Sequence, residues 1–86
     1  MPRVSYNTVY ASAPIPLVQE DLTQDVDGST VLFSPSRAFV INKLWVYLNG
    51  VLQRLDTEVT ENTGTSFTMD TAPQSGDILY VVYQPN

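Results

Sequence analysis

Hydrophobic and polar residues alternate along most of this chain in short runs of the kind that form β-strands. In the run "LWVYL", the residues Leu44, Val46 and Leu48 alternate with Trp45 and Tyr47. Because successive side chains of a strand point to opposite faces of a sheet, these two sets belong to opposite faces. No segment carries apolar residues at helical spacing over several turns, so the sequence predicts almost no helix.

Turn-forming residues separate these runs at short intervals. The turn clusters are "DVDGS" at 25–29, "SPSR" at 34–37, "NG" at 49–50, "ENTG" at 61–64 and "APQSGD" at 72–77. We expect strands near 29–34, 43–48, 51–55, 57–61, 65–69 and 77–83, with further strands before Asp21 and near 22–26. The predicted fold class is therefore all-β: a small antiparallel β-sandwich or partly open barrel of about six to eight short strands.

The pair Asn49-Gly50 predicts a tight hairpin turn between the strands on either side of it. Two-residue hairpin loops favour type I′ turns, which need a positive φ at both central residues, and Asn-Gly tolerates this better than other common pairs. We interpret this pair as a turn needed for its backbone. Six residues of three such turns are assigned structural roles: Asp27, Gly28, Asn49, Gly50, Gly76 and Asp77.

The last predicted strand is apolar on both of its faces. Leu79, Val81 and Tyr83 are expected to face the core, whereas an isolated sandwich would carry polar residues on the opposite face. We therefore expect part of the outer face to be covered, either by the N-terminal segment or another subunit, or by a loop of the same domain. Five residues form this predicted subunit interface: Trp45, Tyr47, Ile78, Tyr80 and Val82.

The first twenty residues differ from the rest, because Pro2, Pro14 and Pro16 fix φ and remove backbone donors. We divide the chain into an extended N-terminal arm, residues 1–20, and a β-sandwich domain, residues 21–86. The arm is either docked on a neighbour or a frayed terminus. Its apolar residues predicted to contact another subunit are Val4, Tyr6, Val9, Tyr10, Ile15, Leu17 and Val18.

Length and composition limit the possible functions. A chain of 86 residues allows one small domain with a marginal core, and without cysteine no disulfide can reinforce it, so extra stability is expected from neighbouring subunits. The formal charge is −5 and the four basic residues are dispersed, which argues against nucleic-acid binding. The longest apolar run, 78–83, is too short to span a bilayer, so we expect a soluble protein without a membrane partner.

Reactive groups are few. The chain has no His and no Cys, so the commonest general base, metal ligand and thiol nucleophile are missing. The acidic residues Glu20, Asp21, Asp25 and Asp27 cluster in sequence, but clusters of this kind are usually solvated loops. We therefore expect no enzyme activity, no catalytic residue and no bound cofactor.

The stretch "DVDGS" is weakly similar to a calcium-binding loop, because Asp25, Asp27 and Gly28 place oxygen atoms around a tight turn. Such a loop needs a bidentate Glu at its twelfth position, where Ser36 stands in this chain. We therefore expect no metal site and interpret Asp27-Gly28 as a hairpin turn between strands near 22–26 and 29–34.

The order of these segments carries more information than any one of them. "DLTQDVDGSTVLFSP", "LWVYLNGVLQ", "EVT" and "GTSFTMDTAPQSGDILYVVY" follow one another in this sequence. Together they resemble a pattern found in virion structural proteins of tailed bacteriophages, especially tail-fibre, neck and baseplate-associated modules. The matching elements are the D-G-S turn leading to Phe33, the "V-Y-L-N-G-x-x-Q" hairpin, a "D-Y-T"-like strand after Asp56, and an "A-P-x-x-G-D" turn before the closing strand.

The resemblance covers residues 21–83 and departs from the pattern in two places. Glu58-Val59-Thr60 stands where such modules carry Tyr in "D-Y-T", and the stretch 34–43 lacks the usual Gly before the Val-Tyr-Leu strand. The arm has no counterpart in the pattern.

The resemblance implies a small β-sandwich used as a repeated, rigid building block in a phage virion, assembled in the host cytoplasm. Its partners would be other copies of itself and other virion proteins in the tail, neck or fibre attachment. We expect the arm to dock on a neighbour, by strand addition along an exposed sheet edge.

Two alternatives remain open at this point. One is a decoration protein that cements the capsid, since both kinds of protein use small oligomeric β-modules. The other is a receptor- or glycan-binding module in which Trp45, Tyr47, Tyr80 and a threonine-rich strand form one platform that stacks sugars. The residues of the threonine-rich patch are Thr60, Thr63, Thr65, Ser66, Thr68 and Thr71.

Overall fold

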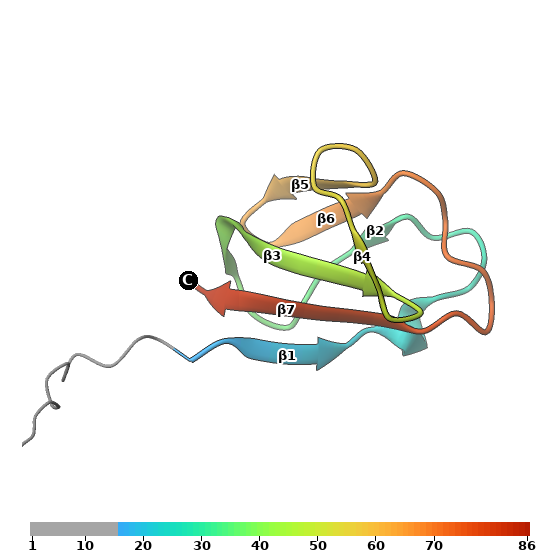
Figure 1. The fold of residues 1–86 in the computed structure, drawn as a ribbon, viewed down its shortest axis with the longest axis horizontal. Helices are drawn as coiled ribbons and strands as arrows, with labels where there is room; N and C mark the ends of the chain where they lie inside the picture. Colours follow the sequence, from blue (N-terminus) through green and yellow to red (C-terminus); the bar gives the residue numbers. More distant parts are fainter. Residues whose placement is uncertain (1–15) are drawn as a thin grey trace, which may run out of the picture.

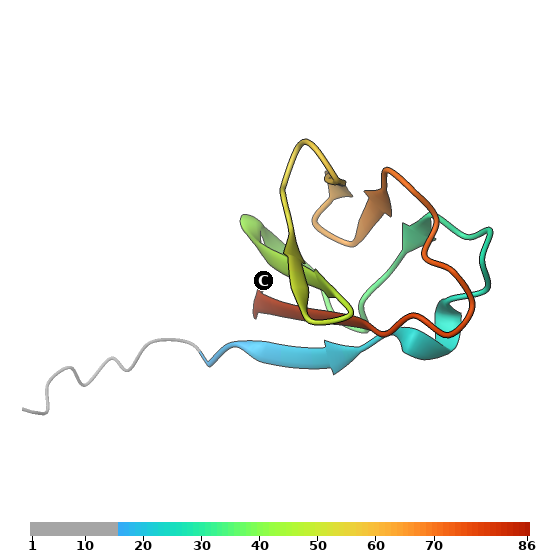
Figure 2. The same ribbon diagram turned by 45° about the vertical axis from the view of Figure 1, so that its right-hand side comes forward.

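Seven short strands form two antiparallel sheets in the computed structural model, which describes residues 16–86 (Figure 1). The strands are β1 (Val18–Asp21), β2 (Leu32–Phe33), β3 (Phe39–Leu48), β4 (Val51–Gln53), β5 (Val59–Thr63), β6 (Ser66–Met69) and β7 (Leu79–Pro85). The larger sheet has the order β1-β7-β3-β4 and the smaller one the order β2-β6-β5. Figure 2 separates the sheets, with blue β1 and red β7 below and orange β6 above. The all-β prediction is confirmed, as a two-layered structure that does not close into a barrel.

The strand predicted near 22–26 is wrong, because residues Thr23–Asp25 form a turn of 3-10 helix. The Thr23 N–H donates to Oδ1 of Asp21 at 2.8 Å, which bends the chain as it leaves β1. An Asp side chain that accepts from the backbone two residues ahead stabilises a turn in competition with strand pairing. The other predicted strands each overlap a strand of the structure, although β2 is only two residues long.

Asp27-Gly28 is consequently not the hairpin turn that the sequence suggested. The chain here passes from β1 in the larger sheet to β2 in the smaller sheet, so the pair does not join two neighbouring strands. Oδ1 of Asp27 accepts the N–H groups of Ser29 and Thr30 at 2.9 and 2.7 Å, and Gly28 adopts a φ of +87°. Residues 27–28 do form a turn, but the turn lies in the connection from the larger sheet to the smaller one.

The core lies between the two sheets and is built from alternate residues of the strands. In β7, Leu79, Val81 and Tyr83 are fully buried and the residues between them are half-buried, as the alternation predicts. Phe33 stacks on Phe67 with ring centroids 5.8 Å apart, which joins β2 to β6. The buried hydrophobic residues are Leu22, Phe33, Phe39, Leu44, Val46, Val59, Phe67, Met69, Leu79, Val81 and Tyr83.

β3 begins earlier than the sequence predicts and bends on its way. Its pairing with β7 shifts between Phe39 and Leu44, where Asn42 adopts a φ of 69°. The Asn42 N–H donates to the Glu61 carboxylate at 2.9 Å, and the Phe39 N–H donates to the Gly64 carbonyl at 2.8 Å. The first part of β3 is therefore fastened to the β5–β6 hairpin of the other sheet, which closes one side of the sandwich.

β1 contains residues that the sequence assigned to the arm. Val18, Gln19 and Glu20 lie in this strand, which pairs with β7 in the register Val18↔Tyr83 to Asp21↔Tyr80. Pro16 and Leu17 precede this strand, and residues 1–15 of the predicted arm lie outside the described residues. The larger sheet thus begins two residues after Pro16.

Glu20 ties β1 to two other parts of the domain. Its Oε1 accepts the hydroxyl of Tyr83 at 2.9 Å, and its carboxylate also accepts the Ser36 N–H at 3.0 and 3.1 Å. Burial, together with the hydrogen bond to Glu20, raises the pKa of Tyr83 above its ordinary value. The neutral phenol is therefore the form that the folded chain favours.

Replacing Tyr83 with Phe removes the donor to Glu20 and keeps the buried ring. We expect the free energy of unfolding to fall by about 1 kcal/mol at neutral pH, the usual effect of losing one hydrogen bond. Because the folded-state pKa is raised, the stability contributed by the neutral phenol is complete below about pH 10 and is lost as the pH rises further. Urea unfolding at neutral and alkaline pH should show this alkaline loss in the wild type and less of it in Tyr83→Phe. Equal alkaline losses would contradict the assignment.

Candidate functional site

The outer face of the larger sheet carries a continuous apolar surface. Across the strands, Trp45 pairs with Val82, and Tyr47 pairs with Tyr80 on one side and Leu52 on the other. Paired residues on one face of a sheet have neighbouring side chains. We call this surface the aromatic face; it consists of Trp45, Tyr47, Leu52, Ile78, Tyr80 and Val82.

The structure brings the five central residues of the predicted interface together on this face. Trp45, Tyr47, Tyr80 and Val82 are half-buried by their neighbours, whereas Ile78 is 55% exposed. Leu52, which the sequence analysis did not single out, is 49% exposed. Its position on the returning strand of the hairpin, opposite Tyr47, was the signal that could have identified it.

A shallow hollow of about 460 Å³ occupies the centre of the aromatic face. Gln19 forms one rim, where its Oε1 accepts the hydroxyl of Tyr80 at 2.8 Å. Gly50 forms another rim at the tip of the β3–β4 hairpin. The floor and walls are the side chains of Tyr47, Ile78, Tyr80 and Val82. The face thus offers apolar area with a few polar atoms at its margin.

β1 forms an open edge beside this face. The Leu22 N–H donates to the Leu79 carbonyl at 2.8 Å, so the backbone groups of Leu22 point toward β7. Alternation in an antiparallel pair then directs the N–H and C=O groups of Gln19 and Asp21 to the other side, where no strand within residues 16–86 pairs with β1. Such unpaired backbone groups are a template for another strand.

Two of the arm residues predicted to contact another subunit fall within the described part of the chain, and they have different positions. Leu17 precedes β1 and is 52% exposed. Val18 is half-buried and packs against the core, so it does not belong to the aromatic face. The predicted contacts at Val4, Tyr6, Val9, Tyr10 and Ile15 lie outside the described residues.

The end of the aromatic face at Ile78 is fixed by the β3–β4 turn. Asn49 and Gly50 have φ values of 52° and 84°, as the predicted type I′ turn requires. The Asn49 N–H donates to the Ile78 carbonyl, and the Ile78 N–H donates to Oδ1 of Asn49, both at 2.8 Å. Nδ2 of Asn49 donates to Oδ1 of Asp77 at 3.1 Å. We call these bonds the Asn49 clamp.

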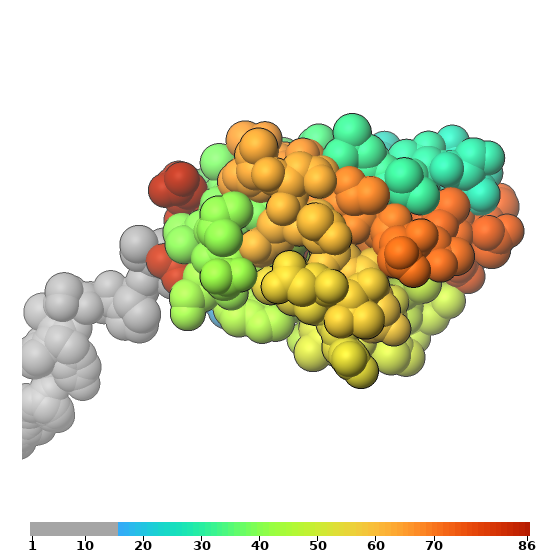
Figure 3. All heavy atoms as spheres, turned by 90° about the horizontal axis from the view of Figure 1, so that it is seen from above, coloured from blue at the N-terminus to red at the C-terminus, as the bar shows by residue number. Residues whose placement is uncertain are grey.

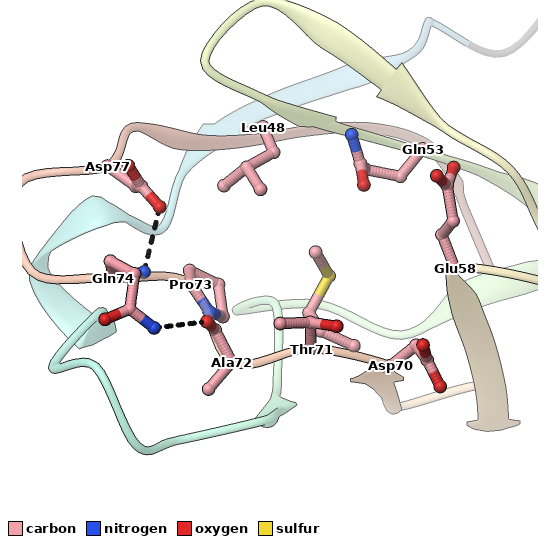
Figure 4. Close-up of a pocket in the computed structure, with 10 residues that line it drawn as sticks. Leu48, Gln53, Glu58, Asp70, Thr71, Ala72, Pro73, Gln74 and Asp77 are labelled. Atoms are coloured by element: carbon pink, nitrogen blue, oxygen red, sulfur yellow. Dashed lines mark hydrogen bonds between the residues drawn. The ribbon is translucent and has the colours of Figure 1, made fainter.

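Asp77 connects the Asn49 clamp to the preceding loop. Its Oδ2 accepts the Gln74 N–H at 2.8 Å, and Gly76 adopts a φ of 98° in the same turn (Figure 4). The hydrogen bonds from Asn49 and from the Gln74 N–H lower the pKa of Asp77 below its ordinary value. From the sequence, Asn49 and Asp77 are residues of two separate turns. The hydrogen bond between their side chains was not predicted.

A second hollow, of about 290 Å³, lies at the end of the sandwich between β4 and the loop that follows β6 (Figure 4). Glu58, Asp70 and Asp77 are its acidic residues. Oε1 of Glu58 already accepts the Arg54 N–H at 2.7 Å, and Asp77 is engaged in the Asn49 clamp. Within residues 16–86, no group of three or more His, Cys, Asp or Glu side chains could hold a metal ion.

Most of the threonine-rich patch lies on the other sheet, in β5 and β6, whereas Thr65 and Thr71 lie in the turns that follow these strands. Ser66 and Thr68 alternate with the buried residues of β6 and so occupy its outer face, which Figure 3 shows in orange. Asn62 Nδ2 donates to Oγ1 of Thr68 at 2.9 Å. The aromatic face belongs to the opposite layer of the sandwich. The two sets of residues therefore do not form the single sugar-stacking platform that the sequence suggested.

Comparisons with protein-family models, with curated proteins and with solved structures give no match to this chain. In the part of the chain that the structure describes, no helix is long and apolar enough to cross a membrane.

Replacing Asp77 with Asn tests the charge in the Asn49 clamp. Because the folded-state pKa of Asp77 is lowered, its carboxylate contributes stability above the unfolded-state pKa of about 3.9, and this contribution is lost as the pH falls further. The stability difference between the wild type and Asp77→Asn should therefore be largest at neutral pH and shrink on acidification. Urea unfolding at several pH values measures it.

Asp70→Asn is the matched control, because Asp70 is exposed and lines the same hollow. We expect this control, which leaves the Asn49 clamp intact, to be closer to the wild type in stability at neutral pH than Asp77→Asn is. If Asp77→Asn shows the same dependence as the wild type, the charge of Asp77 does not stabilise the clamp.

Proposed function

We propose that this chain is a structural component of a tailed-phage virion, in the tail, neck or fibre attachment, that works as a repeated rigid β-module. The observation that supports it most directly is the aromatic face. It gives a domain with a small core a large apolar surface for a second copy of the chain or a neighbouring virion protein. The module contributes rigidity and contact area, and it performs no chemistry.

The composition of the aromatic face suits a protein partner. Tyr and Trp are enriched at the centres of protein interfaces, where they bury large area and keep polar atoms at the rim. Each large apolar side chain that becomes fully buried contributes roughly 1.5–3 kcal/mol. Ile78 and Leu52 have about half of their surface still to bury, so they gain more from a contact than the less exposed tyrosines do.

The open edge of β1 is the second part of the proposed interface. Residues 1–15 join the domain next to this edge and contain one charged residue, Arg3. The remainder of the chain therefore holds all nine acidic residues and three of the four basic ones. We propose that the arm of one copy adds to the β1 edge of the next copy, where opposite charges favour the encounter.

The proposed place in a virion rests on the order of turn and strand segments along the sequence. The D-G-S turn, the Asn-Gly hairpin and the Gly-Asp turn resemble tailed-phage modules, and a small sandwich with an apolar outer face suits a repeated particle component. A capsid decoration protein is the alternative within the same class. Mass spectrometry of purified virions, with antibody labelling of the particle, distinguishes the two by location.

A double substitution, Ile78→Thr with Val82→Thr, tests the aromatic face. Both side chains lie on the outer face, so we expect the free energy of unfolding to change by about 1 kcal/mol or less, which is about 0.5 kcal/mol for each substitution. Self-association in solution, measured by light scattering, or incorporation into particles should fall. Leu32→Thr is the matched control, because Leu32 is 55% exposed on the opposite sheet.

Assembly of the double variant at wild-type level would contradict the proposal. Specific binding of the protein to one glycan of an array, abolished by Tyr80→Ala, would instead favour the receptor-binding alternative. The sugar would then lie in the hollow beside Tyr47.

Deleting residues 2–15 tests the arm while keeping β1 complete. The shortened chain should unfold with nearly the same urea midpoint, because the described core lies within residues 16–86. Its copy number in particles, or its oligomeric mass, should fall. If stoichiometry is unchanged, the arm does not connect the subunits.

A further inference from the structure

The β3–β4 turn contains the one Asn-Gly pair of the sequence, at an exposed position. Asn followed by Gly is chemically labile, because glycine lacks the side chain that would hinder attack by its own backbone nitrogen. The Gly50 nitrogen forms a bond with Cγ of Asn49, the bond from Cγ to Nδ2 breaks, and ammonia leaves with the displaced proton. Water then opens the succinimide ring at one of its two carbonyls, giving aspartate or isoaspartate.

The folded chain opposes the first step of this reaction. Oδ1 of Asn49 is held by the Ile78 N–H at 2.8 Å and Nδ2 by Asp77 at 3.1 Å. The side chain must leave both partners before Cγ can approach the Gly50 nitrogen. One of these partners is a carboxylate, and hydrogen bonds to charged groups are the stronger ones. Asp77 is ionised at neutral pH, and its lowered pKa extends the ionised form to more acidic solutions.

We propose that Asn49 is a site of spontaneous deamidation that the Asn49 clamp protects in the folded chain, and that deamidation there releases the β3–β4 turn from Asp77 and Ile78. The reacting groups are the Asn49 amide, the Gly50 backbone and water. This inference does not depend on a role in a virion.

The product no longer fits the clamp. Aspartate at position 49 places a carboxylate oxygen where Nδ2 now lies, 3.1 Å from Oδ1 of Asp77, so a donor is replaced by a like charge. Isoaspartate also lengthens the backbone within a two-residue turn. Both changes loosen Ile78, which lies at one end of the aromatic face. If Asn49 deamidates while the chain is unfolded, the altered residue remains after refolding, and the aromatic face stays loosened at Ile78.

The first experiment compares deamidation of the full chain in buffer and in concentrated urea, at the same mildly alkaline pH. Peptide mapping by mass spectrometry follows the conversion of Asn49. Because the side chain must first give up two hydrogen bonds, we expect conversion to be slower in the folded chain by about tenfold or more. Gly50→Ala is the chemical control in urea, and it should slow the reaction there by restoring steric hindrance. Equal rates in buffer and urea would overturn the proposal.

A second variant separates the clamp from general folding. Asp77→Ala removes the partner of Nδ2, and we expect the folded variant, checked by circular dichroism under the same conditions, to deamidate faster at Asn49 than the wild type. If the folded variant is no faster, Asp77 does not protect the site. If Asp77→Ala is unfolded, the Oδ1 side of the clamp is tested through Ile78→Pro, which deletes the N–H that Asn49 accepts.

The consequence is tested with Asn49→Asp, which reproduces one product. We expect its unfolding equilibrium constant at neutral pH to rise by about tenfold or more, as a charged hydrogen bond is replaced by repulsion. Asn86→Asp adds the same charge at the exposed end of the described chain and should behave like the wild type. Equal stability of Asn49→Asp and Asn86→Asp would show that deamidation leaves the turn intact.

Discussion

The pairing of β7 with β1 on one side and β3 on the other organises the whole domain. One edge of β7 bonds to β1 and the other to β3, and its inner face supplies three of the most deeply buried side chains. This double use leaves no freedom in register, because a shift of one residue would place Tyr80 and Val82 in the core and expose Leu79 and Val81. The outer face is therefore fixed as firmly as the inner one, and its apolar character is a property that the fold maintains.

The turns form a second unit of organisation. The Asn49 clamp joins the β3–β4 turn to the loop before β7, and Gly28 lies close enough to this loop that an added Cβ would be 3.8 Å from the Ser75 nitrogen. The three turns therefore gather at one end of the sandwich (Figure 1). Segments that the sequence presents as an ordered pattern are neighbours in space. The turn at Gly28, the β3–β4 turn and the loop before β7 follow one another in the sequence because each connects strands at this end of the sandwich.

Much of the fold could be predicted from local patterns. Alternation placed Leu79, Val81 and Tyr83 inside and Tyr80 and Val82 outside, and Asn49-Gly50 predicted its own turn. The 3-10 turn at Thr23–Asp25 was missed because an Asp side chain, not an apolar pattern, decides it. The partners of Glu20 and Asn49 were also missed. They lie 16 to 63 residues away in the chain, and no periodicity reports contacts at that separation.

The position of β7 has a consequence for the way the protein is made. β1 pairs with residues near 80–83, so the larger sheet cannot form on the ribosome until the strand that completes it has been synthesised. Until then Tyr47 has no Tyr80 beside it, and the aromatic face does not exist. The outer face of the larger sheet is therefore complete only when β7 has paired with both β1 and β3.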